Sequence, residues 1–156
     1  MRPAGLAVAL ALFPALAAAE CREDRVDLRG DWGSARFTVE VADEPDERSR
    51  GLMFVESMPR SQGMLFLYEA PHTAMFWMKN TLIPLDMIFV GEDGVVKHIH
   101  HEAQPLDTTT IPGGPGVLAV LEINGGMARD LGIDVGSELR HPGLDPSIAA
   151  WPCPDS

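Results

Sequence analysis

Residues 75–90 read MFWMKNTLIPLDMIFV, and this stretch carries the strongest fold signal in the chain. Alternation along residues 75–79 directs apolar side chains to both faces, which is typical of a strand in a protein interior. A second apolar run follows at 85–90, with Asp86 as its one charged residue. The two runs predict a hairpin that brings Asp86 close to Lys79.

A carboxylate within an apolar run is costly unless it is paired or hydrogen-bonded, so Asp86 needs a partner. In one interpretation it fastens the hairpin by accepting hydrogen bonds from backbone N–H groups or from Lys79. In the other, Lys79, Asn80 and Asp86 line a pocket that binds a polar ligand or performs acid–base chemistry.

Most of the remaining sequence also has the period of short strands. Residues 35–41 alternate, with Phe37, Val39 and Val41 on one face. Two short helices are expected, one capped by Asp43 with Pro45 in its first turn and ending near residues 53–54, and one over residues 127–131. Further strands are expected at 64–68, 95–101, 117–123 and 137–140, with a tight turn at 91–94. The pattern predicts a mainly β fold with two short helices (α+β), a compact barrel-like or rolled-sheet single domain.

A second candidate site lies where the strand at 117–123 gives way to the second helix. Gly125 and Gly126 there leave backbone N–H groups free to hold a carboxylate or phosphate, although tight turns use glycine more often than anion sites do. Glu122, on the preceding strand, adds a polar group near the same rim.

Two histidines allow a metal hypothesis. His98 and His100 are two residues apart on an expected strand and share a face, and imidazoles suit zinc or copper. A solvated strand face also accepts histidines, and spacing fixes no third ligand. We therefore predict no metal centre and no cofactor.

Charge limits the choice of partners. With 12 Lys and Arg against 23 Asp and Glu, the formal charge is −11. Such a chain repels nucleic acid and anionic membrane surfaces, so neither is an expected partner. A hydrophobic content of 46% is enough for a proper core.

Residues 1–19 have the pattern of a secretory signal peptide. Arg2 precedes an apolar run at 6–16, and Ala17 and Ala19 are the small residues that flank cleavage. The run is too short to span a bilayer. We expect an exported, periplasmic or extracellular protein without stable membrane insertion. Loss of Arg2 changes the formal charge from −11 to −12.

The two cysteines, Cys21 and Cys153, lie near the two ends of the processed chain. In an oxidising compartment such an isolated pair predicts a structural disulfide, since the close spacing of redox or metal-binding cysteines is missing. The disulfide would tie the tail at 142–156 and the N-terminal segment at 20–34 to a domain over 35–141.

Several short runs together carry a family resemblance. They are RGLM at 50–53, GMLF at 63–66, FWMKNT at 76–81, PLD at 84–86 and the stretch from Leu121 to Ile133. These runs resemble the domain-of-unknown-function family 192, a widespread prokaryotic family, over about residues 35–141. The resemblance implies a small β-rich domain, often exported, without an established activity. The family tends to have proline at the position of Asn124, and the histidine cluster is not part of its signature.

The sequence favours an exported protein that binds a small polar or anionic ligand at a pocket rimmed by Lys79, Asn80 and Asp86. Two alternatives stay open. One is a cell-envelope hydrolase with Asp86 or Glu122 as general base, and the other is an envelope interaction protein with an exposed apolar patch.

Overall fold

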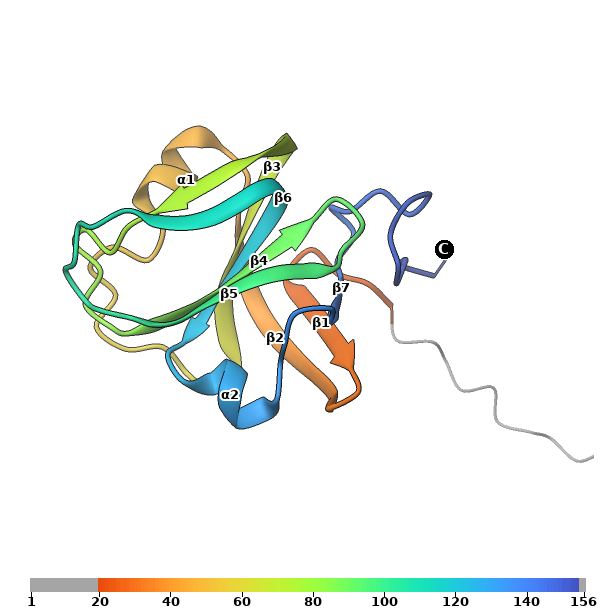
Figure 1. Ribbon diagram of the computed structural model, residues 1–156, viewed down its shortest axis with the longest axis horizontal. Coiled ribbons are helices and arrows are strands. Elements are labelled where there is room, and N and C mark those ends of the chain that lie inside the picture. The colour runs from red at the N-terminus through yellow and green to blue at the C-terminus, as the bar shows by residue number, and fades with distance from the viewer. Residues whose placement is uncertain (1–19, 155–156) are drawn as a thin grey trace, which may run out of the picture.

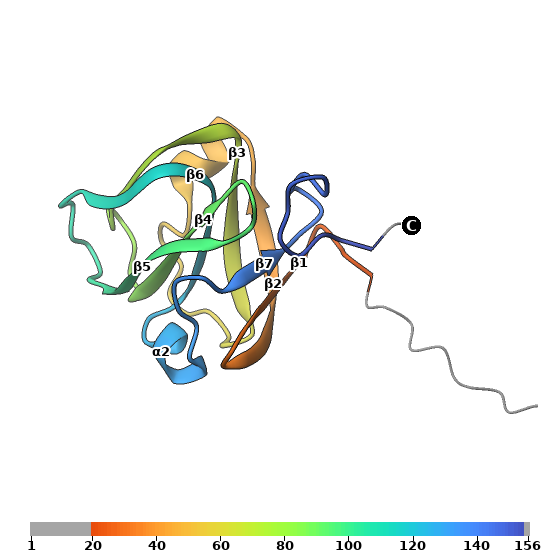
Figure 2. The same ribbon diagram turned by 45° about the vertical axis from the view of Figure 1, so that its right-hand side comes forward.

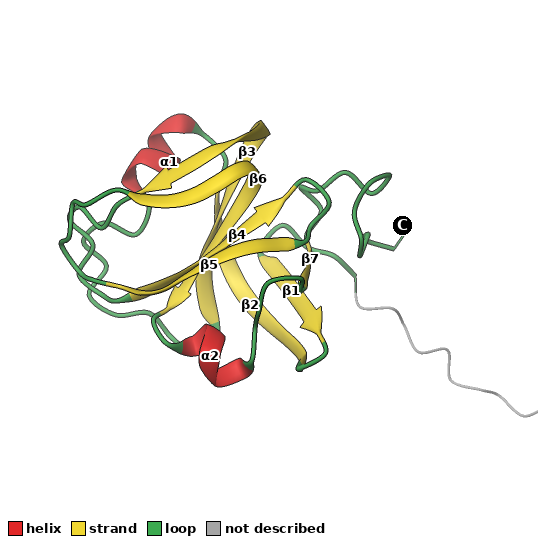
Figure 3. Cartoon of the chain, viewed as in Figure 1, coloured by secondary structure: helices red, strands yellow, loops and turns green. Residues whose placement is uncertain are grey.

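The computed structural model describes residues 20–154, and the predicted signal peptide at 1–19 lies outside the described residues. The fold is mainly β with two short helices, as predicted (Figures 1 and 3). In chain order the elements are β1 (Arg25–Gly30), β2 (Gly33–Ala42), α1 (Pro45–Arg50), β3 (Gln62–Phe76), β4 (Leu85–Gly91), β5 (Val96–Ala103), β6 (Ile111–Asn124), α2 (Met127–Leu131) and β7 (Glu138–Arg140).

The seven strands form one mixed sheet in the order β5-β4-β6-β3-β2-β1-β7. Strands β2 and β3 pair in parallel, and the other neighbours are antiparallel. The sheet curls into a half-barrel. Its two edge strands meet at one end, where the Val96 N–H donates to the Ser137 carbonyl at 2.8 Å and the Leu139 N–H to the Gly94 carbonyl at 2.8 Å.

The curled sheet has an apolar cluster on each face. The inner cluster joins side chains from every strand with α2, including Leu65, Ile88 and Leu121. The outer cluster is built mainly on β3, β4 and β6, and chain outside the sheet, including Leu52 and Met78, packs on it. All seven residues of β4 are therefore buried, which explains the continuous apolar run at 85–90.

The hairpin expected for residues 75–90 is wrong, because β6 lies between β3 and β4. Strand β3 ends at Phe76, and a loop over residues 77–84 follows. Met75 and Trp77 are 67% and 47% exposed, so this run is not an interior strand. An apolar composition identifies a segment that could be buried, but only the fold decides which strand takes the central position.

The helices agree with the sequence except in the N-cap and the last residue of α1. Helix α1 starts at Pro45 as expected, but its N-cap is Glu44, which forms a capping box with Glu47. It ends at Arg50, earlier than expected, because Gly51 leaves the helix with φ of 49°. Strand β1 was not expected from the sequence.

The predicted disulfide is confirmed, since Cys21 and Cys153 are bonded. The chain near Cys153 also packs against the body: the Trp151 ring lies 4.4 Å from the Arg29 guanidinium carbon and 4.2 Å from that of Arg140. Figure 2 shows this C-terminal segment beside β1 and β7. Among residues 20–154 there is no helix with the length and apolarity needed to cross a membrane.

Candidate functional site

Glu122 is a carboxyl group in the middle of an apolar face. On β6 it lies opposite Met64 of β3 and Met87 of β4, and its residue is only 4% exposed. Burial raises the pKa of Glu122 to about 8. No hydrogen bond joins its carboxyl group to any other part of the chain within residues 20–154. At neutral pH the group is therefore mostly protonated and has an O–H to donate.

Glu122 lines a small cavity of about 40 Å³. The other walls come from three places: the end of α1 with the turn after it, two phenylalanines of β3, and the loop after β3. In that order the lining residues are 48–53, then Phe66 and Phe76, then Trp77, Lys79 and Thr81.

The turn after α1 brings its end over the sheet. Gly51 adopts a positive φ of 49°, and a Cβ there would stand 3.2 Å from the Phe66 ring. A glycine is thus needed both for the backbone conformation and for the close approach. Phe66 in turn meets Phe76 edge to face, with ring centroids 5.2 Å apart. These contacts fix the turn that carries Arg50 against β3.

The loop after β3 presents Lys79 on a tight turn. The Thr81 N–H donates to the Met78 carbonyl at 3.1 Å, and Asn80 adopts φ of 53°, a conformation that asparagine tolerates well. The Lys79 ammonium lies 5.1 Å from the centroid of the Trp77 ring. This distance fits a cation–π contact, which keeps the charge beside the cavity.

The cavity is lined by two basic residues that form no ion pair within residues 20–154. Among residues 20–154, every Lys and Arg except Arg25, Arg50 and Lys79 forms an ion pair with a carboxylate. Arg50 and Lys79 both line the cavity of Glu122. In a chain of formal charge −11, two unpaired cations at one hollow favour an anionic ligand there.

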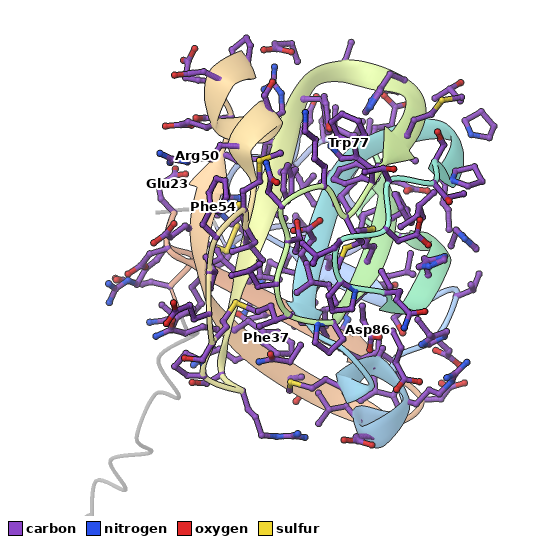
Figure 4. The ribbon with its side chains drawn as sticks, turned by 90° about the vertical axis from the view of Figure 1, so that its left-hand side faces the viewer. Glu23, Phe37, Arg50, Phe54, Trp77 and Asp86 are labelled. Atoms are coloured by element: carbon purple, nitrogen blue, oxygen red, sulfur yellow. A yellow bond between two sulfur atoms is a disulfide. The ribbon has the colours of Figure 1, made fainter. Side chains whose placement is uncertain are left out.

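Asp86 lies on the other face of the sheet. Its neighbour Met87 pairs with Glu122, and Asp86 pairs with Ile123, so the two carboxyl side chains point to opposite sides. Figure 4 shows Asp86 near α2, away from Arg50 and Trp77.

The Asp86 carboxylate is fully buried and accepts three backbone hydrogen bonds. The donors are the N–H groups of Glu102 at 2.8 Å, Gly126 at 3.0 Å and Ala128 at 2.8 Å. The sequence predicted that the Gly126 N–H could bind a ligand anion. In the structure it donates to the Asp86 carboxylate instead. The Gly125 N–H donates to the Pro84 carbonyl at 2.9 Å.

The candidate ligand-binding residues predicted from the sequence therefore lie in two separate places in the structure. Lys79 and Glu122 share one cavity, and the Asn80 side-chain nitrogen lies 3.8 Å from the Met53 sulfur at its edge. Asp86, Gly125 and Gly126 gather at the start of α2 instead. Sequence reasoning missed Arg50, Trp77 and Thr81, although all three belong to the runs RGLM and FWMKNT.

The two candidate histidines lie on β5. The His98 ring stacks on Phe89 with centroids 5.6 Å apart, and burial lowers the pKa of His100. Within the described part of the chain, no group of three or more His, Cys, Asp or Glu side chains is placed to hold a metal ion.

A larger hollow of about 400 Å³ lies between the β1–β2 turn and the chain before β7. Its Arg29 already pairs with Glu138 at 2.6 Å, so it offers no unpaired cation. Size alone therefore does not make it the better candidate.

These features define a class: a half-barrel β protein with a small cation-rimmed cavity over a buried acid. The chain belongs to the DUF192 family, described as "Uncharacterized ACR, COG1430", whose profile matches residues 26–141. The matched region starts within β1, nine residues before the domain start expected from the sequence. No curated protein matches the chain.

Two solved structures are similar over most of the chain. A protein of unknown function from Novosphingobium aromaticivorans is 42% identical, with a TM-score of 0.74, covering 85% of this chain and 93% of that one. A Sinorhizobium meliloti protein, described provisionally as a transcription regulator, is 38% identical, with a TM-score of 0.75, covering 81% of this chain and 99% of that one.

Proposed function

We propose that this protein binds a small anionic group, such as a carboxylate or phosphate, in the cavity formed by Arg50, Lys79 and Glu122. The observation that carries the proposal is the buried Glu122 carboxyl group. Within residues 20–154 it forms no hydrogen bond, and it lines a hollow with two basic residues, Arg50 and Lys79, that form no ion pair there. Because Glu122 lines the cavity and none of the hydrogen bonds within residues 20–154 involves its carboxyl group, its O–H is free to be donated to a group bound there.

The protonation state of Glu122 fits an anion rather than a cation. A neutral carboxyl donates its O–H to an anionic oxygen, while Lys79 and Arg50 supply the opposite charge. Since one water needs about 10–15 Å³, a cavity of about 40 Å³ admits an anionic group of only a few atoms.

The hydrolase hypothesis has less support. Asp86 is fully buried and accepts three backbone hydrogen bonds, so it is poorly placed as a general base. Glu122, with a raised pKa of about 8, would act as an acid at neutral pH. The regulator description belongs to the Sinorhizobium meliloti protein. For this chain, a formal charge of −11 argues against nucleic-acid binding.

Titration with sodium acetate and with sodium phosphate at pH 6 and constant ionic strength tests the proposal. Calorimetry or a thermal shift should detect binding of at least one anion, and Lys79→Gln and Arg50→Gln should each weaken it about tenfold, as loss of a charge-assisted contact does. Arg25→Gln is the matched control, because within residues 20–154 Arg25 is the third basic residue without an ion pair and it lies outside the cavity. Equal effects of all three substitutions, or no binding, would contradict the proposal.

We also propose that the protein is exported and loses residues 1–19. The Cys21–Cys153 disulfide supports this, because such bonds persist in oxidising compartments. Mass spectrometry of the protein isolated from its source should find a chain that starts at Glu20 and lacks free thiols. A cytoplasmic chain that keeps Met1 and two reduced cysteines would contradict it.

A further inference from the structure

The mouth of the cavity is continuous with an exposed apolar surface. Four large side chains form this loop surface: Phe54, Trp77, Leu82 and Leu106 are 67%, 47%, 41% and 59% exposed. Trp77 belongs both to the loop surface and to the cavity wall, so the two features touch. Figure 4 shows Phe54, Trp77 and Arg50 in the upper part of the view, above Phe37 and Asp86.

The backbone holds two of these side chains in place at a cost. Phe54 and Leu106 both have left-handed backbone conformations, with φ of 64° and 65°, which are uncommon for large side chains. Their N–H groups donate to the carbonyls of consecutive loop residues, Asn80 at 2.8 Å and Thr81 at 3.0 Å. Two strained and exposed apolar residues fixed beside one loop are typical of a binding surface rather than of a random surface position.

We propose that the ligand is a single amphiphilic anion, whose charged group enters the cavity and whose acyl or aryl part lies on the loop surface. This inference rests on the proposed function. The cavity of about 40 Å³ is too small for more than the charged group, so the rest of any larger ligand must lie outside its mouth. The surface at that mouth is apolar, which selects an apolar tail.

Charge argues for one molecule rather than a membrane. A single amphiphile brings one anionic group to Lys79 and Arg50. An anionic bilayer would bring many such groups against a protein of formal charge −11 and would be repelled.

A chain-length series of free carboxylates tests the inference. Acetate, hexanoate, octanoate and decanoate, each kept below its micelle concentration, are titrated against the full protein by calorimetry. The affinity should rise by roughly twofold to fourfold for each methylene that reaches the loop surface.

The double variant Phe54→Asn with Leu106→Asn removes the apolar side chains and keeps residues that tolerate a positive φ. It should bind acetate within about twofold of the wild type and lose most of the dependence on chain length. The control is Val135→Asn with Ile148→Asn, two exposed apolar positions elsewhere, which should keep that dependence.

The outcomes separate the two proposals. Acetate binding that depends on Lys79 but shows no chain-length dependence overturns the amphiphile and leaves the proposed function standing. Absence of any Lys79-dependent binding removes both. Binding to anionic phospholipid vesicles but not to monomeric decanoate, or self-association that the Phe54 and Leu106 substitutions abolish, assigns the loop surface to another occupant and also overturns the inference.

Discussion

Glu122 is a residue that selection for stability alone does not explain. A carboxyl group between Met64 and Met87 adds no packing that a larger apolar side chain would not supply. Deprotonation in that position is strongly unfavourable, because burial raises the pKa to about 8. A buried ionisable group that forms no hydrogen bond within residues 20–154 is a candidate for function on these grounds.

The raised pKa makes stability depend on pH in a defined direction. The pKa of Glu122 is about 8 in the folded protein and near its usual 4.5 in the unfolded chain, so the folded state binds more protons between these values. The contribution of Glu122 is thus fully present below pH 4.5 and is lost as the pH rises through 8. The full loss is on the order of 5 kcal/mol.

Glu122→Gln should remove this dependence, since glutamine is similar in size and does not ionise. Denaturant unfolding at pH 5 should give similar free energies for the wild type and the variant, and at pH 9 the variant should be more stable by a few kcal/mol. The difference between the two proteins isolates Glu122 from every other titrating group. A constant difference across this range would show that Glu122 does not titrate as described.

Asp86 should behave in the opposite way, as a structural residue. Asp86→Asn leaves one oxygen to accept three backbone N–H groups and turns an NH₂ group toward the same donors. We expect a loss of about 3 kcal/mol or more in the free energy of unfolding, measured by urea denaturation. Acetate affinity should be kept at temperatures where the variant is folded. Asp31→Asn, at an exposed position, is the control and should change stability little.

At the scale of elements, local sequence patterns predicted most strands and both helices. They did not predict which strands lie side by side in the sheet. The apolar run at 85–90 is central because β5 and β6 pair with its two edges. The equally apolar run at 75–79 borders a loop, and nothing local distinguishes the two runs. The same limit applies to the site: Lys79 and Glu122 could be singled out by their unusual neighbours, but Arg50 joins them only because α1 folds over β3.

The pairing of β3 with β6 beside Glu122 depends on Gly63. A Cβ at this position would stand 2.5 Å from the Glu122 carbonyl oxygen and 3.2 Å from Ile123, so the strands would have to separate. Gly63→Ala should therefore lower the free energy of unfolding by about 1–3 kcal/mol and weaken acetate binding. Gly114→Ala is the comparison, because its Cβ meets no atom within 4 Å and only its φ of 85° is unfavourable. A Gly63 variant as stable as the wild type would show that the strands accommodate the methyl group.

At the scale of the whole molecule, the disulfide and the cavity lie at opposite ends of the half-barrel. Figure 1 shows the C-terminal segment on one side of the half-barrel and α1 on the other. Cys21→Ser with Cys153→Ser opens a loop with a sequence separation of 132 residues. The chain-entropy model predicts that closing such a loop stabilises the folded state by about 5 kcal/mol. We expect a smaller loss, about 2–4 kcal/mol, because Trp151 still contacts Arg29 and Arg140 after the bond is removed.

The loss of stability in the double serine variant should not change anion binding at the cavity. In the double serine variant, amide hydrogen exchange should accelerate in residues 21–24 and 142–154, where the bond fastens the chain ends, and stay slow in β4 and β6. Acetate affinity at 25 °C should match the wild type within about twofold, since neither cysteine lines the cavity. A similar loss of acetate affinity would mean that the chain ends joined by the Cys21–Cys153 disulfide and the cavity unfold as one cooperative unit. The disulfide would then affect binding as well as stability.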